Sequence, residues 1–366
     1  MNILAPIGNV NEVNSLLDIG ADELYTGLTI GSINDLTNYT NARIKNNHNL
    51  IDWDQLKSVN EIIVARKSRL HLTLNSPIYS KEQFPWLETY VKKTIDTGIK
   101  SFIVNCPSMV QFLKDIDKKV NIKMSCLAVV LNSESAKFYH DMGASTIVFP
   151  RHVTFDEMRN IIKNNPKLKF EAMIANSRCR NMNGLCNFTH QMERKWFDIG
   201  SQKKKFSVLK KKVFGYYYQK IMPYVQNTKM AYKVFKKRAP CRDDYKIKIS
   251  PENSKKRIIK KNLEDFYKPN MGKECGLCAL YYLKQMSVSS VKIVGRGRAM
   301  NIKKEPAIML KKAIKLLNKG ISKEEYFVKV KKILKETTNV KCSPFNCHYP
   351  EVFYNQNSTF QKLYKK

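Results

Sequence analysis

Cysteine spacing is the strongest chemical signal in this sequence. Cys179 and Cys186 are separated by six residues, in a polar segment that contains Gly184 and directly follows an apolar run. Three further cysteines lie downstream, Cys241, Cys275 and Cys278, so the chain has enough sulfurs for a site with four thiolates. Four thiolates hold an iron-sulfur cluster or a structural zinc ion, but a zinc site usually takes two tight C-x2-C pairs and CGLC supplies one. Two buried structural thiols would be the plainer interpretation of this pair. The spacing instead predicts a metal centre.

The other cysteines and the histidines predict no comparable centre. Cys106 and Cys126 lie in or at the end of apolar runs and are expected in the core or at the mouth of the fold. Cys342 and Cys347 with His348 could form a small second metal site, although a tail that packs against the rest of the fold is the favoured interpretation. The six histidines form no HExxH pair, and no Ser-His-Asp or Cys-His arrangement is visible, so the residues give little support to proteolysis.

Polar side chains also stand in or at the ends of predicted strands, and they are Asn75, Arg151, Glu171, Lys292 and Arg296. Strands that converge in a barrel place such side chains around one pocket, which makes these five the candidate catalytic residues. Two arginines and a lysine suit an anionic small molecule or a phosphate. For each residue, a structural salt bridge at the barrel rim is an equally good interpretation.

The elements that would position these residues alternate regularly. Apolar runs typical of buried strands occur at 2–8, 23–28, 69–75, 101–106, 122–130, 145–150, 169–175 and 291–294. Helical patterns occur between and after them, at 11–17, 53–60, 83–96, 108–117, 133–142, 154–164, 306–318 and 322–336. Capping boxes at 80–83, 154–157 and 322–325 start three of these helices. The alternation predicts an α/β fold, a (β/α)8 TIM-barrel-like fold with a cysteine-bearing insertion after the seventh strand.

This fold predicts four regions along the chain. Residues 1–175 supply barrel strands one to seven, and 176–284 form a cysteine-rich and Lys/aromatic-rich insertion that carries the cluster. Residues 285–320 supply the eighth strand and the closing helix, and 321–366 form a C-terminal helix and tail. Loops after the strands of a parallel barrel rise from the face where active sites are built, so we expect the insertion to cap the mouth.

The positive charge of the chain is concentrated in one segment. The net charge is +34, and residues 201–270 hold 21 Lys and Arg against 5 Asp and Glu, interleaved with eleven Phe and Tyr. Cations mixed with aromatic residues suit single-stranded RNA, and they suit an amphipathic lid that packs on the barrel equally well. No apolar run is long enough for a membrane span and no signal peptide is indicated, so a cytoplasmic protein is the simplest expectation.

These motifs resemble peptidase family U32, the collagenase-like peptidases. The similarity is carried by the signature from Glu171 to Thr189, by CGLCALYYLKQMSVSSVKIVGR at 275–296, and by the opening ILAPIGNVNEVNSLLDIGADELYTG. The resemblance implies a [4Fe-4S] cluster with the ligands Cys179, Cys186, Cys241 and Cys275, and Cys278 as a substitute for the fourth or its neighbour. The lysine-rich insertion before Cys241 departs from the shorter spacing of the family.

The resemblance also implies an activity. Several U32 proteins serve hydroxylation without molecular oxygen, on a tRNA or ribosomal RNA base or, as a paired complex, on a quinone precursor, with prephenate as the oxygen donor in some. Arg151 and Arg296 would then hold an anionic substrate or donor, and segment 201–270 favours RNA over a quinone. The alternatives are a U32-type peptidase, a peptide-maturation enzyme, and a non-catalytic iron-sulfur subunit that works with a second U32 protein. The sequence does not specify the redox partner.

Overall fold

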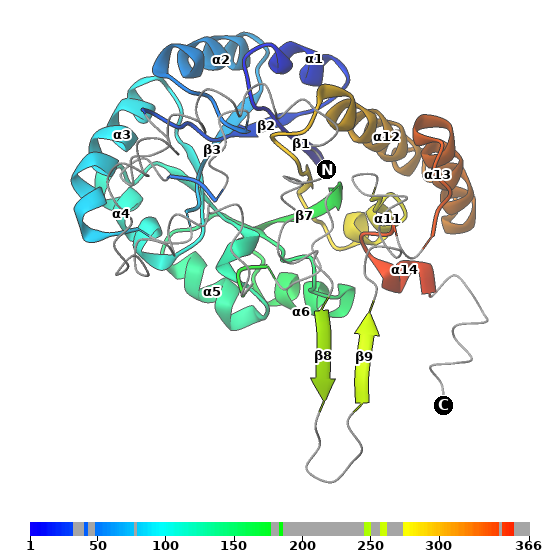
Figure 1. Cartoon of the computed structure of the whole chain (residues 1–366). Coiled ribbons are helices and arrows are strands. Elements are labelled where there is room, and N and C mark those ends of the chain that lie inside the picture. The colour runs from blue at the N-terminus through cyan, green and yellow to red at the C-terminus, as the bar shows by residue number, and fades with distance from the viewer. Residues whose placement is uncertain are drawn as a thin grey trace, which may run out of the picture. The chain divides into compact units, whose positions relative to one another are not determined.

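Eight parallel strands close into a barrel in the order β1-β10-β7-β6-β5-β4-β3-β2 (Figure 1). The structure is a computed structural model that describes residues 1–31, 40–42, 48–76, 79–176, 183–185, 245–249, 257–261, 274–343 and 346–354. The barrel strands are β1 (Asn2–Pro6), β2 (Glu23–Thr26), β3 (Arg69–Leu74), β4 (Ser101–Val104), β5 (Asn121–Met124), β6 (Thr146–Val148), β7 (Lys169–Ala175) and β10 (Ser290–Ile293). The predicted TIM-barrel-like fold is therefore confirmed.

The predicted fifth strand is too long. It was expected to reach residue 130, but β5 ends at Met124 and a 3-10 turn follows at Cys126–Ala128. The Ser125 side chain accepts a hydrogen bond from the Leu127 N–H at 3.3 Å, and this local bond competes with the strand ladder. Val129 then adopts a left-handed conformation with φ 57°, which ends the extended run.

Helices surround the barrel, and most begin where the sequence predicts. They are α1 (Glu12–Asp18), α2 (Trp53–Ala65), α3 (Phe84–Asp96), α4 (Pro107–Ile116), α5 (Ser133–Asp141), α6 (Phe155–Asn164), α11 (Ala279–Gln285), α12 (Met300–Asn318), α13 (Lys323–Thr338) and α14 (Pro350–Tyr354). Two of the three predicted capping boxes form, one at Thr154 with Glu157 and one at Ser80 with Gln83, while Ser322 caps α13 by accepting from the Glu325 N–H. Each box satisfies amide groups that the first turn of a helix leaves without partners.

Helix α12 begins six residues earlier than predicted because its proline is tolerated inside the helix. Pro306 has no N–H, so the carbonyl of Ile302 lacks its usual donor four residues later. The Asn176 side chain, which directly follows β7, donates to that carbonyl at 2.9 Å. Asn176 itself is left-handed, with φ 62°. One side chain thus replaces the missing helix bond and ties α12 to the end of β7.

The chain divides into two compact units. One consists of Met1–Cys186 with Phe266–Lys366, and the other is Asn187–Asp265. In the second unit, strands β8 (Tyr245–Ile249) and β9 (Arg257–Lys261) form an antiparallel pair. The four predicted regions stay predictions. Within the described residues, no helix has both the length and the apolar character to cross a membrane.

Candidate functional site

Five ionisable side chains form a continuous chain across the barrel interior, and they are His71, Glu23, Lys123, Glu171 and Lys292. The His71 Nε2 lies 2.8 Å from the Glu23 carboxylate, and the Lys123 Nζ lies 3.2 Å from that carboxylate and 3.1 Å from Glu171. The Lys292 Nζ lies 3.4 Å from the other oxygen of Glu171. Lys123 on β5 and Glu23 on β2 are not on neighbouring strands. Their contact must therefore cross the inside of the barrel.

The charges in this layer stabilise one another. Burial alone would raise the pKa of Glu171, but Lys123 and Lys292 outweigh it and bring that pKa to about 2. Burial works against the charge on Lys123 as well, yet Glu171 and Glu23 on either side raise its pKa. Lys292 faces one carboxylate and the charge of Lys123, so burial lowers its pKa. The two carboxylates and Lys123 are therefore held charged.

His71 completes the layer as a neutral hydrogen-bonding group. Burial lowers the pKa of its imidazole despite the neighbouring Glu23. Its Nδ1 lies 2.6 Å from the Ser101 Oγ, which accepts a hydrogen bond from the Asn121 side chain at 2.7 Å. Ser101 can therefore donate to Nδ1 while Nε2–H donates to Glu23, which is the tautomer that satisfies every partner.

An apolar layer separates these charges from the mouth of the barrel. Its members are Cys126, Val148, Met173 and Val294, each buried and in one cluster. Met173 stands two residues beyond Glu171 on β7, and Val294 stands two residues beyond Lys292, directly after the end of β10. Because side chains on a strand repeat every two residues, they occupy the next level toward the carboxyl ends. Glu171 and Lys292, predicted at the mouth, therefore lie one level below it.

Three members of the charged layer were missed from the sequence, and these are Glu23, His71 and Lys123. The signal was available, because each is a charged or titratable residue inside a strand of four to six residues that is otherwise largely apolar. Such residues are almost never fully buried unless they are paired. Their presence on inward positions predicts partners across the barrel.

At the mouth, Arg296 is held by polar groups from β3 and from the connection between β2 and α2. Its Nη1 donates to the Thr73 Oγ1 at 2.7 Å and to the Asn41 Oδ1 at 3.3 Å, and only 7% of the residue is exposed. Gly27 makes this approach possible, since a Cβ there would lie 2.5 Å from the Arg296 Nη1. Nearby, the Asn75 Oδ1 accepts from the Ala42 N–H at 3.3 Å. Both predicted residues thus organise the loops above β2 and β3.

Arg151 connects the end of β6 to the cysteine segment. Its backbone N–H and its Nη1 both donate to the Asn183 Oδ1, at 3.1 and 3.2 Å, and Asn183 lies between Cys179 and Cys186 in the sequence. Its Nε is buried and has no hydrogen-bond partner among the described residues. Gly184 follows with φ 80°, and a Cβ there would lie 2.4 Å from the Leu127 carbonyl. Residues 183–185 therefore pack on the loops that follow β5 and β6.

Cys275 lies between β7 and the C-terminal tail. It forms an antiparallel bridge with Ala175, the last residue of β7, and a parallel bridge with Cys347. Its N–H donates to the Asn346 carbonyl at 2.7 Å, and its Sγ accepts from the Leu277 N–H at 3.4 Å. The first bridge brings Cys275 beside the start of the segment that contains Cys179.

The tail packs against the barrel, which confirms the favoured interpretation of Cys342 and Cys347. The His348 N–H donates to the Cys275 carbonyl at 2.8 Å, and the Tyr349 hydroxyl donates to the Met173 carbonyl at the same distance. Burial raises the pKa of the Cys275 thiol well above its ordinary value, and the nearby thiols of Cys278, Cys347 and Cys342 add to the effect. The four sulfurs therefore gather on one side of the barrel.

The chemistry of the described donors fits a thiolate-bound cluster. Cys275 and Cys278 are partly buried, and an N–H donates to the sulfur of the first. Hydrogen bonds to sulfur and restricted solvent are the features by which proteins adjust such clusters. Cys179, Cys186 and Cys241 lie outside the described residues. Within the described residues, no three His, Cys, Asp or Glu side chains are arranged to hold a metal ion.

Comparison with known proteins shows the family. Residues 8–204 match the sequence model of peptidase family U32. The chain belongs to peptidase family U32. Within U32, "tRNA hydroxylation protein P" of Helicobacter pylori is 26% identical over 188 residues, which are 51% of this chain and 42% of that protein. The "Collagenase" of Porphyromonas gingivalis is 24% identical over 159 residues, which are 43% of this chain and 35% of that protein.

The likeness covers part of each U32 protein. The matched stretch spans less than half the length of these curated relatives. A solved U32 peptidase is similar over 48% of this chain and 69% of its own, with 13% identity and a TM-score of 0.39. The barrel assignment rests on the strand order of this chain, which is closed and parallel.

Proposed function

We propose that this U32 protein is an iron-sulfur enzyme that hydroxylates an RNA base, in tRNA, without molecular oxygen. The observation that carries the proposal is the bridge between Cys275 and Ala175, which joins the two cysteine-bearing parts of the sequence beside the barrel mouth. Arg151 and Arg296 lie at the ends of their strands near that mouth. Relatives from several bacteria carry the name tRNA hydroxylation protein P, which favours an RNA base over a quinone precursor.

The cofactor of this proposal is a [4Fe-4S] cluster. Cys179, Cys186, Cys241 and Cys275 would hold it, and Cys278 is the alternative fourth ligand. A bound cluster would supply one-electron transfer. Burial of Cys275 would restrict solvent at that ligand, and the Leu277 N–H that donates to its sulfur would stabilise the thiolate against the effect of burial.

The two arginines would bind an anionic oxygen donor, with prephenate as the candidate. Thr73 and Asn41 fix one edge of the Arg296 guanidinium, so its orientation is set before any ligand arrives. The buried Arg151 Nε has no described partner, and a carboxylate oxygen would satisfy it. Substrate binding would then use preorganised charge rather than side chains that must first be ordered.

The proposed partners are RNA, through residues 201–270, together with an electron donor and a second U32 subunit. A U32-type peptidase is the second candidate, because one relative is named collagenase. Peptide maturation or a non-catalytic partner subunit would fit the same cluster without RNA chemistry. The two peptide-directed enzymes would have peptide products and the non-catalytic subunit would have none, so experiment can separate these alternatives.

The test combines metal content with RNA analysis. Protein purified without oxygen should contain about four iron and four sulfide per chain, with loss in Cys179→Ser and Cys275→Ser and retention in the control Cys106→Ser. Loss in Cys278→Ser instead of Cys275→Ser would reassign the fourth ligand. Mass spectrometry of tRNA from a deletion strain should show one hydroxylated base missing, restored by the wild-type gene only. Zinc in place of iron, or an unchanged tRNA profile, would overturn the proposal, and peptide cleavage that survives loss of the cluster would favour the peptidase.

A further inference from the structure

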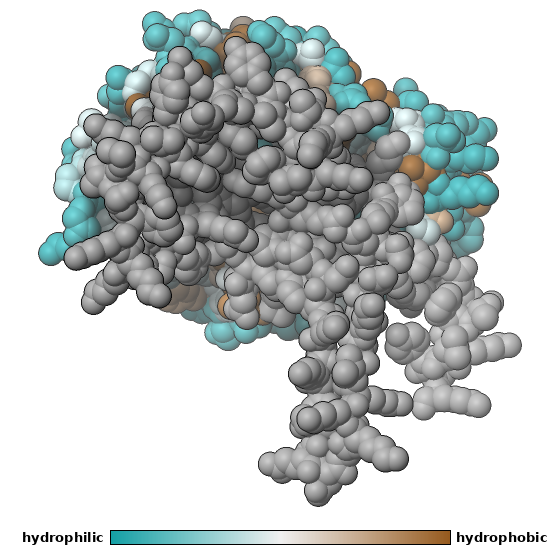
Figure 2. Space-filling model, viewed as in Figure 1, coloured by the Kyte–Doolittle hydropathy of each residue, from teal (hydrophilic) through white to brown (hydrophobic). Residues whose placement is uncertain are grey.

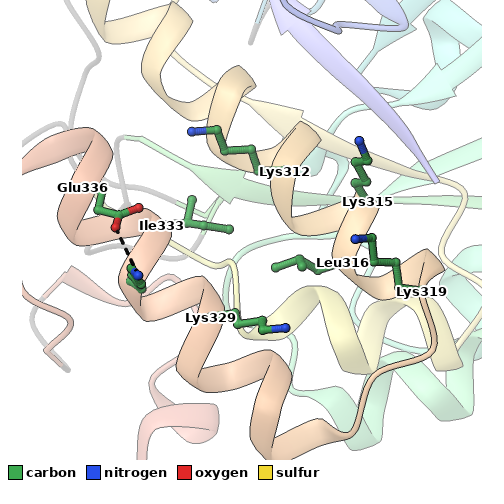
Figure 3. Close-up of a pocket in the computed structure, with 8 residues that line it drawn as sticks. Lys312, Lys315, Leu316, Lys319, Lys329, Ile333 and Glu336 are labelled. Carbon is green, nitrogen blue, oxygen red and sulfur yellow. Dashed lines mark ion pairs between the residues drawn. The ribbon is translucent and has the colours of Figure 1, made fainter.

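A groove lined by lysines runs between α12 and α13 (Figure 3). Its volume is about 380 Å³, and no cysteine and neither arginine of the mouth is among its lining residues. The residues that line it are Lys312, Lys315, Leu316, Lys319, Lys329, Lys332, Ile333 and Glu336. No part of the proposed chemistry uses these side chains.

The two helices contribute matching faces to the groove. On each helix the lining positions have the spacing i, i+3, i+4 and i+7, which places them on one side. The third of these positions is apolar on both helices, Leu316 on α12 and Ile333 on α13, and the other positions are charged. Figure 3 shows Leu316 and Ile333 between the two rows of charged side chains. The groove thus has an apolar floor with lysines along both edges.

The charge in the groove is only partly neutralised. Lys329 pairs with Glu325 at 2.5 Å and Lys332 pairs with Glu336 at 3.7 Å. Among the residues that the structure describes, no carboxylate pairs with Lys312, Lys315 or Lys319. Like charges at these spacings each destabilise a helix by about 0.2–0.5 kcal/mol, and a bound polyanion would offset that repulsion.

The plainer interpretation is that lysines near the end of a helix complement its dipole. Lys315 and Lys319 lie in or just after the last turn of α12, where a positive charge is favourable. That account does not extend to Lys312, which lies earlier on α12. It also does not extend to the lysines of α13, because Lys329 lies in the middle of that helix.

The groove is held on a rigid support. The opposite face of α12 is buried, at Ala307, Leu310 and Ala313, and α13 buries Tyr326 and Val330. The described outer surface around α13, on the right of Figure 2, is mostly hydrophilic. The lysines are therefore solvent-exposed and held on helices that are packed against the barrel. Such a surface suits the phosphate backbone of a nucleic acid rather than an apolar partner.

We propose that the groove between α12 and α13 binds the phosphate backbone of the RNA substrate. The identity of the occupant rests on the proposed function. Helix α12 begins four residues after Arg296, so Lys312 to Lys319 lie about 18–28 Å along the helix from its start near the mouth. The RNA would thus have two contact sites on the protein. Its target base would enter the mouth, and the groove would bind the backbone of a helical stem or strand beyond that base.

The test compares two full-length triple variants with equal charge change. The groove variant is Lys312→Gln, Lys315→Gln and Lys319→Gln. The control variant is Lys118→Gln, Lys163→Gln and Lys167→Gln, which are exposed lysines on other elements. Binding to fluorescently labelled bulk tRNA is measured by anisotropy from 50 to 300 mM salt. Circular dichroism and iron content check that both variants fold like the wild type.

We expect the groove variant to bind tRNA at least about tenfold more weakly at 0.1 M salt. The slope of log K against log salt should become shallower by about 2–3, because each lost phosphate contact removes about 0.7–0.9 from it. The control should keep the wild-type slope. Glu336→Gln, which removes the one acidic side chain of the groove, should strengthen binding.

Three outcomes would overturn the inference. If wild type binds tRNA and both triple variants keep its slope, the groove is not a phosphate site, while the proposed function stands. If wild type binds no tRNA, the proposed RNA activity fails together with the groove. If the groove variant changes only the oligomeric state in light scattering, the groove is an interface between two copies of this chain.

Discussion

Glu171 gives the sharpest test of the charged layer inside the barrel. Its carboxylate is fully buried and is shared by Lys123, Lys292 and the Ser290 hydroxyl. Glu171→Gln keeps the shape of the side chain but leaves two buried lysines with Glu23 as their remaining carboxylate in the layer. Removing one partner of a buried ion pair costs about 3–5 kcal/mol, because an uncompensated charge stays in the interior.

The pH dependence gives an independent magnitude. The pKa of Glu171 is about 2 in the folded protein against 4.5 for the ordinary group. That difference in pKa corresponds to about 3 kcal/mol of stability. The contribution is fully present at a pH above the pKa of the unfolded state, and it is lost as the pH falls toward the pKa of the folded state. The stability difference between wild type and Glu171→Gln should therefore be constant from pH 7 to pH 5. At pH 3 about 1.5 kcal/mol of it should remain.

Urea unfolding of both proteins from pH 7 to pH 3 measures this difference, and Glu325→Gln is the matched control. The Glu325 carboxylate lies 2.5 Å from the Lys329 Nζ, closer than any contact of Glu171, but both side chains are about half exposed. Exposed helix pairs of this kind contribute about 0.3–0.5 kcal/mol. The reasoning is refuted if the two variants lose similar stability at pH 7, or if the effect of Glu171→Gln does not decrease between pH 5 and pH 3.

Three further substitutions test the loops and caps. Asn176→Ala removes the donor to the Ile302 carbonyl and should destabilise the fold by about 1–3 kcal/mol in urea unfolding, whereas an unchanged midpoint would mean that this carbonyl has another partner. Gly184→Ala adds a methyl group at a left-handed position, 2.4 Å from the Leu127 carbonyl. It should therefore displace the turn at residues 183–185 and lower the iron content measured after anaerobic purification. Full iron content would contradict the packing of that turn on the Leu127 loop. Thr154→Ala breaks a capping box and should cost about 1 kcal/mol, while Thr154→Ser should recover most of it.

The sequence was sufficient for the barrel because the barrel depends on local patterns. Short apolar runs alternate with amphipathic helices, and hydroxyl-acid boxes such as Thr154 with Glu157 mark helix starts. Errors occurred where a single side chain overrode the pattern. Ser125 ended the fifth strand through its own hydrogen bond, and Asn176 allowed α12 to continue around Pro306. The second case depends on a contact between residues 126 positions apart, which no local rule detects.

The site was only partly predictable for the same reason. Strand position placed Arg296 and Arg151 at the mouth, because the carboxyl ends of parallel strands converge there. It did not separate the mouth from the level below, so Glu171 and Lys292 were expected among the mouth residues rather than in the polar interior. Their depth depends on how the strands stagger around the barrel, which is a property of the closed sheet and not of one strand.

The bridge at Cys275 has a consequence for the order in which this protein can be assembled. Cys275 forms a bridge on one side with Ala175 at the end of β7, synthesised about 100 residues before it, and is hydrogen-bonded on the other side to Asn346 and His348, made about 70 residues after it. During synthesis on the ribosome, the barrel strands can therefore all be complete while this cysteine still lacks its second neighbour. The pairing of Cys275 on both sides is therefore completed only after residues 346–348 have been synthesised and have packed against it.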